Sequence, residues 1–444
     1  MNVRVPLAEY TASVTESFPY PAKQRAVETS VLHRRTFDTL PINQPLSGAL
    51  TDNYLEFRIP GIEGRFIDLS TIILELDVAV IKGDGTAINT DEDRLTLING
   101  LGGGTIFKSV TCFLNETLVE SNPVFTQWSM IRQLTGFRPS QLQGLGSNAF
   151  FHKEGRGNGN THKFTEDYFN NLKDAEKTEI NDYLTHGANV TAPLFLDLAS
   201  LDEYLLDNVS LRIRLELASN QTVINTHLVD NNYTYRINSA RLWLHAVTPY
   251  PDALNALNSA MIDDNESVNY VFNKTLYKTY VLAGNQTSLL MDNPFGQAIP
   301  EKLYVVLQDL DAFTGSYNYN AIHFLHGKVN RITVTINGTD AYDITADYPR
   351  KYSKLYATTL EALGYEKDHM ISKFGFKSGS CVMMFDLRKS TDMNTVPLEI
   401  NGSMRLNLTL ERGATQNRVV LLFGETRGVL TINPDRRVTT DFRA

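Results

Sequence analysis

The sequence predicts an all-β chain built from two tandem jelly-roll sandwiches, a double jelly roll, with a few short helices. Three observations predict this fold. Apolar and polar residues alternate with a period of two along most of the chain, as in strands with one buried face. Helical patterns are few and short. Strand, turn and helix signals recur in the same order in both halves, which indicates a duplicated domain.

Composition bounds the class of protein. The 444 residues suffice for two to four domains, and 42% hydrophobic with 20% charged residues is a globular balance. A net charge of −9 argues against a bulk nucleic-acid binder, which needs a basic surplus. The two cysteines, Cys112 and Cys381, lie far apart in apolar segments. We expect buried free thiols rather than a disulfide framework or a cysteine-based zinc module.

Export and membrane signals are absent from the pattern. Residues 1–20 contain Arg4, Glu9 and Glu16 and no apolar run, so we expect no secretory signal. No stretch of about 18 residues is both apolar and uncharged, so we expect no membrane span.

Residues 1–47 are expected to form an N-terminal arm. Pro19, Pro21 and Pro41 interrupt this segment, and it lacks the period-two pattern of a strand. It carries five basic and four acidic residues, in contrast to the acidic remainder. We expect the arm to pack on something else or to stay mobile rather than to join a sheet.

The first jelly roll is expected over residues 48–250. Alternation along Leu74–Val80 and Val209–Leu217 marks two of its strands. One helix is predicted from Pro123 to Thr135, with an apolar stripe that includes Trp128. A second is predicted over 164–184, capped by Thr165.

The second jelly roll is expected over residues 266–434. A linking helix within residues 251–265 precedes it, and residues 435–444 are expected to form a C-terminal tail. Alternation over 332–336 and 404–410 marks strands, and a helix is predicted from Pro349 to Leu363.

The internal repeat carries most of the fold prediction. Hairpin turns are predicted at Asn115-Glu116 and at Asn337-Gly338, each followed by a short strand, a proline, a helix and a glycine. The distance between matched elements shrinks between these hairpins and the strands that follow Ser210 and Ser403. The first half therefore carries an insertion, at about residues 138–190, which we expect at one end of the sandwich in contact with solvent.

Two glycine-rich segments could suggest a phosphate loop. Gly100–Thr105 lacks the Gly-Lys-Ser/Thr ending and is followed by a strand, so we interpret it as a flexible loop. Gly155–Asn160 lacks a third glycine in place and a preceding strand, and we interpret it as a solvated loop.

Other chemical motifs are weak. His323 and His326 have metal-like spacing, but in a strand over 320–327 they would lie on opposite faces. The acidic clusters 91–93 and 263–266 are expected to be exposed loop charges, with a Ca²⁺ site left open. We therefore predict no catalytic, cofactor-binding or metal-ligating residue, no cofactor and no enzymatic activity.

A set of short segments follows one another in a familiar order. They are Glu56–Pro60, Phe66–Ser70, the hairpin at Asn115, Ala192–Asp197 followed by Leu211–Leu217, Ala312–Asn320 with His323-Phe324, the Asn337-Gly338 turn and Phe385–Leu387. In this order they resemble the hexon-like major capsid proteins of polinton/Maverick elements and adintoviruses. The chain departs from that pattern at Asn318–Ala321, where the family has a proline-containing Asn-Pro-Phe stretch, and in residues 138–190.

The resemblance implies a double jelly-roll major capsid protein located in the virion and assembled inside the host cell. It implies homotrimers of pseudo-sixfold outline that tile an icosahedral shell around double-stranded DNA. It also implies capsomer–capsomer contacts and partners among penton and minor capsid proteins. We expect the N-terminal arm on the inner side of the shell, with at most weak contact with packaged DNA.

Two alternatives stay open at this point. One is a two-sandwich carbohydrate-binding or carbohydrate-processing protein, which requires an aromatic-lined cleft with two facing carboxylates. The other is a cellular scaffold derived from a capsid gene. A flat interface between copies would favour the capsid reading.

Overall fold

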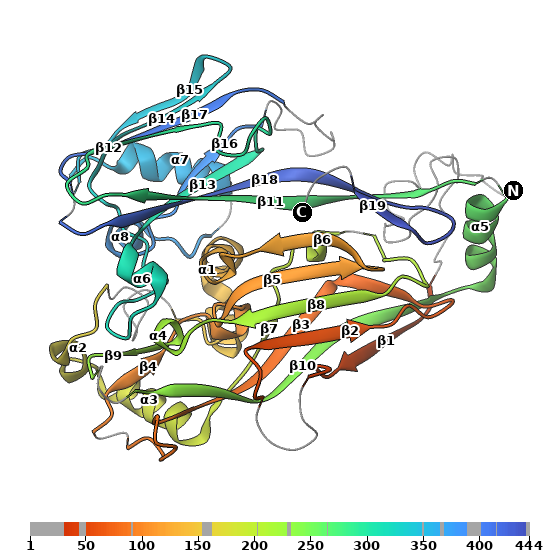
Figure 1. Cartoon of the computed structure of the whole chain (residues 1–444), viewed down its shortest axis with the longest axis horizontal. Coiled ribbons are helices and arrows are strands. Elements are labelled where there is room, and N and C mark those ends of the chain that lie inside the picture. The colour runs from red at the N-terminus through yellow and green to blue at the C-terminus, as the bar shows by residue number, and fades with distance from the viewer. Residues whose placement is uncertain are drawn as a thin grey trace, which may run out of the picture.

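The computed structural model describes residues 31–43, 50–89, 92–152, 162–201, 203–228, 232–263, 265–348, 350–364, 368–388, 401–413 and 415–440. It contains two adjacent β-sandwiches, and in Figure 1 the second lies above the first. The all-β, double jelly-roll prediction is confirmed.

The first sandwich consists of two four-stranded antiparallel sheets, in the orders β1-β10-β3-β7 and β2-β8-β5-β6. A separate short pair joins β4 to β9. The strands are β1 (Val31–Thr39), β2 (Tyr54–Ile59), β3 (Phe66–Ile81), β4 (Leu95–Leu97), β5 (Phe107–Leu114), β6 (Thr117–Asn122), β7 (Ala188–Pro193), β8 (Leu211–Leu217), β9 (Ile224–Thr226) and β10 (Thr234–Pro249).

The second sandwich repeats this strand order, as β11-β18-β13-β16 and β12-β17-β14-β15, with β19 added on β18. Each strand of the two four-stranded sheets in the first sandwich thus has a counterpart in chain order, as the internal repeat predicted, whereas the β4-β9 pair has none among the described residues. The strands are β11 (Val268–Leu282), β12 (Ser288–Asp292), β13 (Lys302–Asp309), β14 (Val329–Ile336), β15 (Thr339–Thr345), β16 (Met383–Asp386), β17 (Met404–Leu410), β18 (Arg418–Ile432) and β19 (Val438–Thr440).

Both predicted hairpin turns adopt the tight left-handed form. In the first, Asn115 and Glu116 have φ of 43° and 67°; in the second, Asn337 and Gly338 have φ of 51° and 80°. Positive φ at both central residues matches the right-handed twist of the flanking strands, and asparagine and glycine tolerate it best. The turns therefore fix the register of β5 with β6 and of β14 with β15.

Helices close the sandwiches and connect them. Helices α1 and α7 follow the two hairpins, and α5 links the sandwiches. They are α1 (Phe125–Gly136), α2 (Glu166–Asn170), α3 (Asp174–His186), α4 (Asn220–Val223), α5 (Pro251–Ile262), α6 (Leu310–Thr314), α7 (Ser353–Leu363) and α8 (Lys373–Ser378).

The single helix predicted over 164–184 is wrong, because two helices occupy this region. Thr165 caps the first as predicted, since its Oγ1 accepts from Tyr168 N at 3.3 Å. Lys173 then turns to an extended conformation, and its backbone N–H donates to Glu176 Oε2 at 3.0 Å. This local cap starts α3 and ends any continuous helix.

The prediction that all of residues 1–47 lie outside the sheets is also wrong. Strand β1 pairs with β10 from Val31↔Pro249 to Thr39↔Leu242 and forms one edge of the first sandwich. Most of its side chains are exposed, so the segment carries no apolar alternation that the sequence could reveal. Residues 1–30 of the expected arm lie outside the described residues.

Residues 138–190 are not simply a solvated insertion. Phe150, Phe151 and Tyr183 are buried in the core, and β7 begins inside this range and pairs with β3. Burial of these aromatic rings makes the flanks of the segment part of the sandwich. The loop predicted at Gly155–Asn160 lies outside the described residues.

The C-terminus likewise extends the sheet. Val438–Thr440 forms β19 on β18, within the segment expected as a tail. Cys112 and Cys381 are buried free thiols, as expected. Within the described ranges, the helices are all too short or too polar to cross a membrane.

Candidate functional site

The region where the two sandwiches meet, here called the joint, brings together side chains from many elements of both. Helix α1 forms its centre and is held by the turn at Gly100–Thr105. Gln133 Nε2 donates to Gly100 O at 2.9 Å, and a Cβ on Gly103 would lie 2.3 Å from Gln133 Cδ. The flexible loop predicted here is therefore wrong: the turn is buried, because its glycines let α1 approach the backbone closely.

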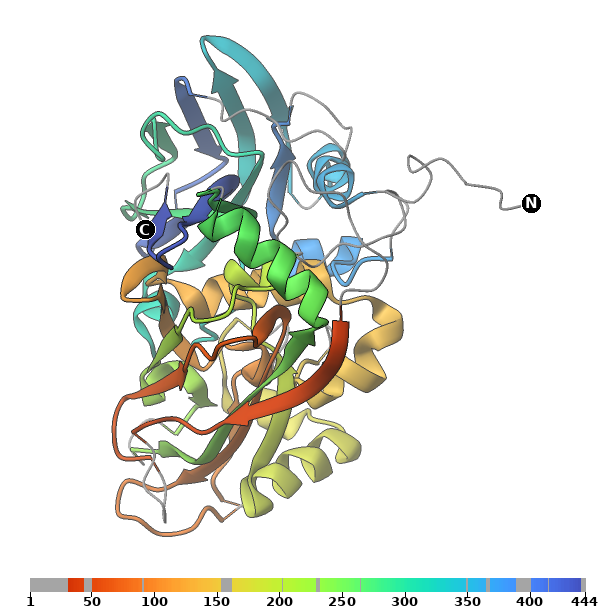
Figure 2. The same ribbon diagram turned by 90° about the vertical axis from the view of Figure 1, so that its right-hand side faces the viewer.

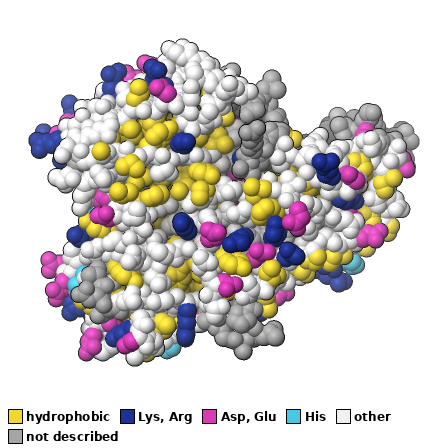
Figure 3. Space-filling model, in the orientation of Figure 1, with side chains coloured by type: hydrophobic (Ala, Val, Ile, Leu, Met, Phe, Trp, Pro, Cys, Tyr) yellow, Lys and Arg dark blue, Asp and Glu magenta, His cyan; other side chains and the backbone are white. Residues whose placement is uncertain are grey.

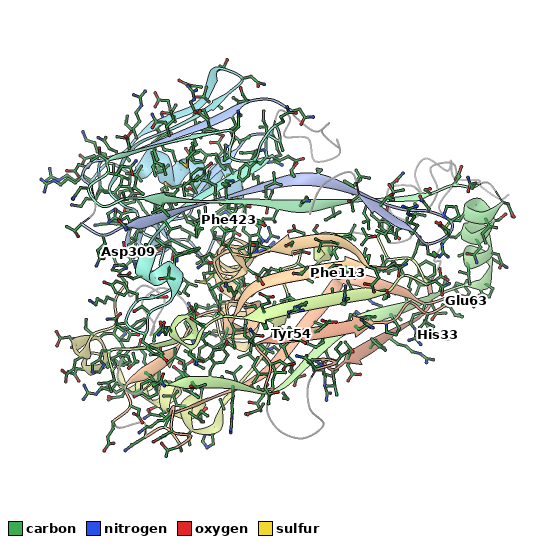
Figure 4. The ribbon with its side chains drawn as sticks, in the orientation of Figure 1. His33, Tyr54, Glu63, Phe113, Asp309 and Phe423 are labelled. Carbon is green, nitrogen blue, oxygen red and sulfur yellow. The ribbon has the colours of Figure 1, made fainter. Side chains whose placement is uncertain are left out.

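The opposite side of α1 contacts the second sandwich. Trp128 stacks on Phe423 of β18 with ring centroids 5.1 Å apart, and meets Tyr304 of β13 edge-on at 5.4 Å. Arg132 lies one turn later, with Nη1 2.7 Å from Glu425 Oε1. Aromatic contact and a partly shielded ion pair together fix the helix on the sheet. Figure 4 shows Phe423 between the two sandwiches.

Sequence reasoning placed Trp128 on the apolar stripe of this helix but did not identify the joint. The missed signal is that α1 is buried almost all round, from Phe125 to Leu134. A helix of this kind has neighbours on more than one side, whereas a surface helix keeps a polar face.

Carboxylates reinforce the joint beside α1. Asp197, after β7, accepts from Thr275 N at 2.7 Å and from Thr275 Oγ1 at 2.6 Å, which ties β11 to the first sandwich. Burial raises the pKa of Asp197 to about 6. Burial and the charge of Asp197 raise the pKa of Glu120 well above its usual value. Glu120 Oε2 also accepts from Leu198 N at 3.3 Å.

A third contact joins the hairpin and turns of the first sandwich to the end of β18. Arg436 Nη2 lies 2.5 Å from Asp207 Oδ1, and Gly64 N donates to Asp207 Oδ2 at 2.9 Å. Asn115 Nδ2 donates to Arg436 O at 3.0 Å. The Asp207 side chain is 3% exposed, so losing either partner would leave a buried charge.

The region 138–190 makes the fourth contact. Phe164 N donates to Asn318 O at 2.9 Å, and His162 Nε2 lies 2.8 Å from Asp309 Oδ2. The His162 ring lies 5.1 Å from that of His323, whose pKa burial lowers to about 3. Asp309 lies at the opposite end of the joint from α5 (Figure 4). Four separate contacts therefore make the two sandwiches one unit.

The strand that the sequence predicts over residues 320–327, with His323 and His326 on opposite faces, is wrong. The segment 320–327 forms turns with isolated bridges rather than a strand. His326 stacks on Tyr348 with centroids 4.4 Å apart, whereas His323 faces His162. The two imidazoles thus have different neighbours.

The acidic cluster at 91–93 is not wholly exposed. Asp93 is 2% exposed, with Oδ2 2.8 Å from Lys82 Nζ and Oδ1 accepting from Tyr233 at 2.7 Å. Asp91 and Asp264 lie outside the described residues. Among the residues that the structure describes, no three His, Cys, Asp or Glu side chains are grouped as metal ligands.

One pocket bears on the carbohydrate alternative. It has a volume of about 240 Å³ and is lined by Glu120, Asp197, Tyr277 and Phe295 among others. It combines two carboxyls with two aromatic rings. Both Asp197 oxygens and one Glu120 oxygen, however, already accept hydrogen bonds from the protein. Hydrogen bonds therefore hold the two carboxyls in the joint. Glycoside hydrolysis requires instead two carboxyls that face each other across an open cleft.

One face of the β2-β8-β5-β6 sheet carries arginine side chains stacked on aromatic rings. Arg212 lies over Phe113 at 4.1 Å, and Arg214 lies over Tyr54 at 4.2 Å. Tyr54 on β2 and Phe113 on β5 lie on the two strands that flank β8, which carries both arginines (Figure 4). Such guanidinium–aromatic stacks stiffen the side chains of an exposed sheet.

Three solved structures share this architecture. In the 3.5 Å cryo-EM structure of the Sputnik virophage, the matching chain has a TM-score of 0.58 and 14% identity, covering 100% of this chain and 93% of that one. A quasi-atomic model of the PBCV-1 virus capsid gives 0.53 and 10%, covering 95% and 100%. The Faustovirus major capsid protein gives 0.52 and 8%, covering 96% and 94%.

No protein-family model and no curated protein sequence matches the chain. The likeness to the three structures extends over nearly the whole of each chain at very low identity. It therefore establishes a shared fold, the double jelly roll.

Proposed function

We propose that this chain is a structural major capsid protein whose homotrimers tile an icosahedral shell around double-stranded DNA. One observation carries the proposal: two sandwiches of identical strand order are fixed to each other in one chain, as in the capsid structures above. Three such chains supply six similar units, which approximate a hexagon able to tile a surface.

The joint supports this role. A tile must keep its shape while neighbours press on it, and a hinge between the sandwiches would defeat this. Aromatic stacking at Trp128, the Thr275 bonds to Asp197 and the Asp207–Arg436 pair are spread along the length of the joint. Contacts at several points resist rotation better than one linker does.

The surface supports assembly rather than catalysis. Figure 3 shows hydrophobic side chains gathered on the second sandwich, with charges of both signs mixed over the first. Tyr277, Val281 and Leu290, on the edge strands β11 and β12, are 36%, 58% and 54% exposed. Exposed apolar groups of this size on two neighbouring edges are typical of protein contacts.

Finer parts of the proposal follow from the resemblance of the sequence. The capsid would be that of a polinton/Maverick element or an adintovirus. The protein would lie in the virion, with penton and minor capsid proteins as partners. Residues 1–30 would lie on the inner side of the shell. A net charge of −9 favours weak contact with packaged DNA, because few phosphate charges would be neutralised.

Solution mass tests the trimer. Light scattering on the purified full chain at micromolar concentration should give three times the mass of one chain, at low and at high salt. A monomer under every salt condition would overturn the proposal. Particles recovered from expressing cells should also protect DNA from nuclease; empty shells would instead favour a scaffold derived from a capsid gene.

A further inference from the structure

Among the residues that the structure describes, one helix and one sheet of the internal repeat lack the contact that their counterparts make. Within the chain, α1 of the first sandwich covers the outer face of the β11-β18-β13-β16 sheet through Trp128 and Phe423. The counterpart of α1 is α7, and the counterpart of that sheet is β1-β10-β3-β7. In Figure 2, α1 lies between the two sandwiches, whereas α7 lies on the outer flank of the second.

The outer face of the β1-β10-β3-β7 sheet centres on Trp243. Trp243 lies directly opposite Ile73, and both are half-buried, whereas Phe423 in the counterpart sheet is 0% exposed. Trp243 Nε1 donates to Glu75 Oε2 at 2.9 Å, and the Arg241 guanidinium lies 5.5 Å from the Trp243 ring. A preformed tryptophan platform with arginine at its rim is typical of the centre of a protein interface.

Helix α7 offers a matching face. Its inner side is fixed by Thr359, whose Oγ1 donates to Val382 O and accepts from Met384 N, each at 3.2 Å. The next two residues are less buried than Thr359: Leu360 is half-buried and Glu361 is exposed. An apolar side chain beside an acid can pair with the tryptophan and arginine of the sheet.

We propose that α7 of one copy packs on the outer face of the β1-β10-β3-β7 sheet of the next copy, with Leu360 against Trp243 and Glu361 near Arg241. This rests on the proposed trimer and assigns the surfaces that form it. The contact is head-to-tail, because each copy gives a helix to one neighbour and a sheet to the other. Such a contact forms a closed trimer when the rotation between neighbouring copies brings the third copy back to the first.

Two arginine variants test the head-to-tail contact. Leu360→Arg removes the helix side and Trp243→Arg removes the sheet side. Each variant alone should lose the trimer and run as a monomer with a cooperative melting transition. Mixed in equal amounts, they should form a one-to-one heterodimer, since one intact helix meets one intact sheet. Ile262→Arg, at a side chain 69% exposed on α5, is the matched control and should stay trimeric.

Each other outcome has a definite meaning. Variants that remain trimeric would overturn this interface and leave the proposed function standing. Two monomers that fail to combine would also overturn it. A monomeric wild-type chain would overturn the proposed function itself.

A second measurement covers arginine variants that fail to fold. Leu360→Cys chains mixed with Ile73→Cys chains should form disulfide-linked dimers under mild oxidation, and neither should do so alone. The native Cys112 and Cys381 are buried and should not interfere. Trimers without this cross-link would again overturn the interface.

Discussion

Trp128 of α1 stacks on Phe423 of β18 with an interplanar angle of 25°. Through this aromatic pair the first sandwich contacts the outer face of a sheet in the second. Trp128 is 3% exposed and Phe423 is 0% exposed. These two residues are nearly 300 positions apart in the chain, and their contact is one of several that join the two sandwiches.

Removing the tryptophan should therefore weaken the whole molecule. We predict that Trp128→Ala lowers the free energy of unfolding by about 3–5 kcal/mol, the usual range for a large aromatic deleted from a core. The joint should also open, giving two melting transitions in place of one. Calorimetry tests this, with Tyr250→Ala, at a ring 46% exposed, as the control that melts like the wild type. An unchanged single transition in Trp128→Ala would contradict the role of the joint.

Two truncations separate the arm from the strand that follows it. Deleting residues 1–30 leaves β1 intact, so we predict unchanged melting and unchanged trimers, with impaired shell formation if the arm bridges capsomers. Deleting residues 1–39 removes β1 and exposes the long edge of β10, so we predict aggregation. Solubility and melting temperature measure both effects. Equal behaviour of the two truncations would show that β1 is dispensable.

Glu120→Gln tests the buried carboxyls. Burial, and secondly the charge of Asp197, raise the pKa of Glu120 in the folded chain. In the unfolded chain the pKa of Glu120 is lower. Between these two pKa values the folded chain therefore keeps a proton on Glu120 that the unfolded chain has lost. The free energy of unfolding of the wild type should therefore fall as the pH rises from that lower pKa through the raised one. Glutamine mimics the protonated form and removes this loss.

The melting temperature of Glu120→Gln should exceed that of the wild type by more at pH 8 than at pH 5. Glu116→Gln is the control, because the Glu116 side chain is 77% exposed. A difference between Glu120→Gln and the wild type that does not change with pH would show that Glu120 is ionised in the folded chain.

Gly61→Ala tests a close backbone approach between the turns at one end of the first sandwich. A Cβ at Gly61 would lie 2.5 Å from the carbonyl carbon of Asn208 and from the nitrogen of Val209. Backbone atoms cannot move aside cheaply, so we predict a loss of about 1–3 kcal/mol in the free energy of unfolding. Gly144→Ala, where a Cβ meets nothing within 4 Å, should cost far less in the same denaturant titration.

Local sequence patterns were sufficient to predict the fold, whereas contacts between residues far apart in the chain could not be predicted. The hairpins at Asn115 and Asn337 were predictable because turn chemistry and flanking alternation are local. Strand β1 was missed because most of its side chains are exposed, so this edge strand has no apolar period. The rigid turn at Gly100 and the buried charge of Asp93 depend on Gln133 and Lys82, which only the folded chain brings near.

The candidate site was less predictable than the fold. Trp128 was recognisable as an apolar residue of a helix. Its partner Phe423, however, lies in a run of apolar residues in β18, and such a run does not distinguish the outer face of the strand from the face in the sandwich core. Both faces of that part of β18 are buried, so inward and outward residues have the same character. A run of apolar residues in a strand therefore signals a covered sheet without saying what covers it.

Electron microscopy of the purified chain tests the proposed trimeric capsomer most directly. We predict closed particles of three chains with six lobes and a hexagonal outline, which pack edge to edge into sheets or shells at high concentration. Single two-lobed particles that never associate, or rings with another number of lobes, would contradict it.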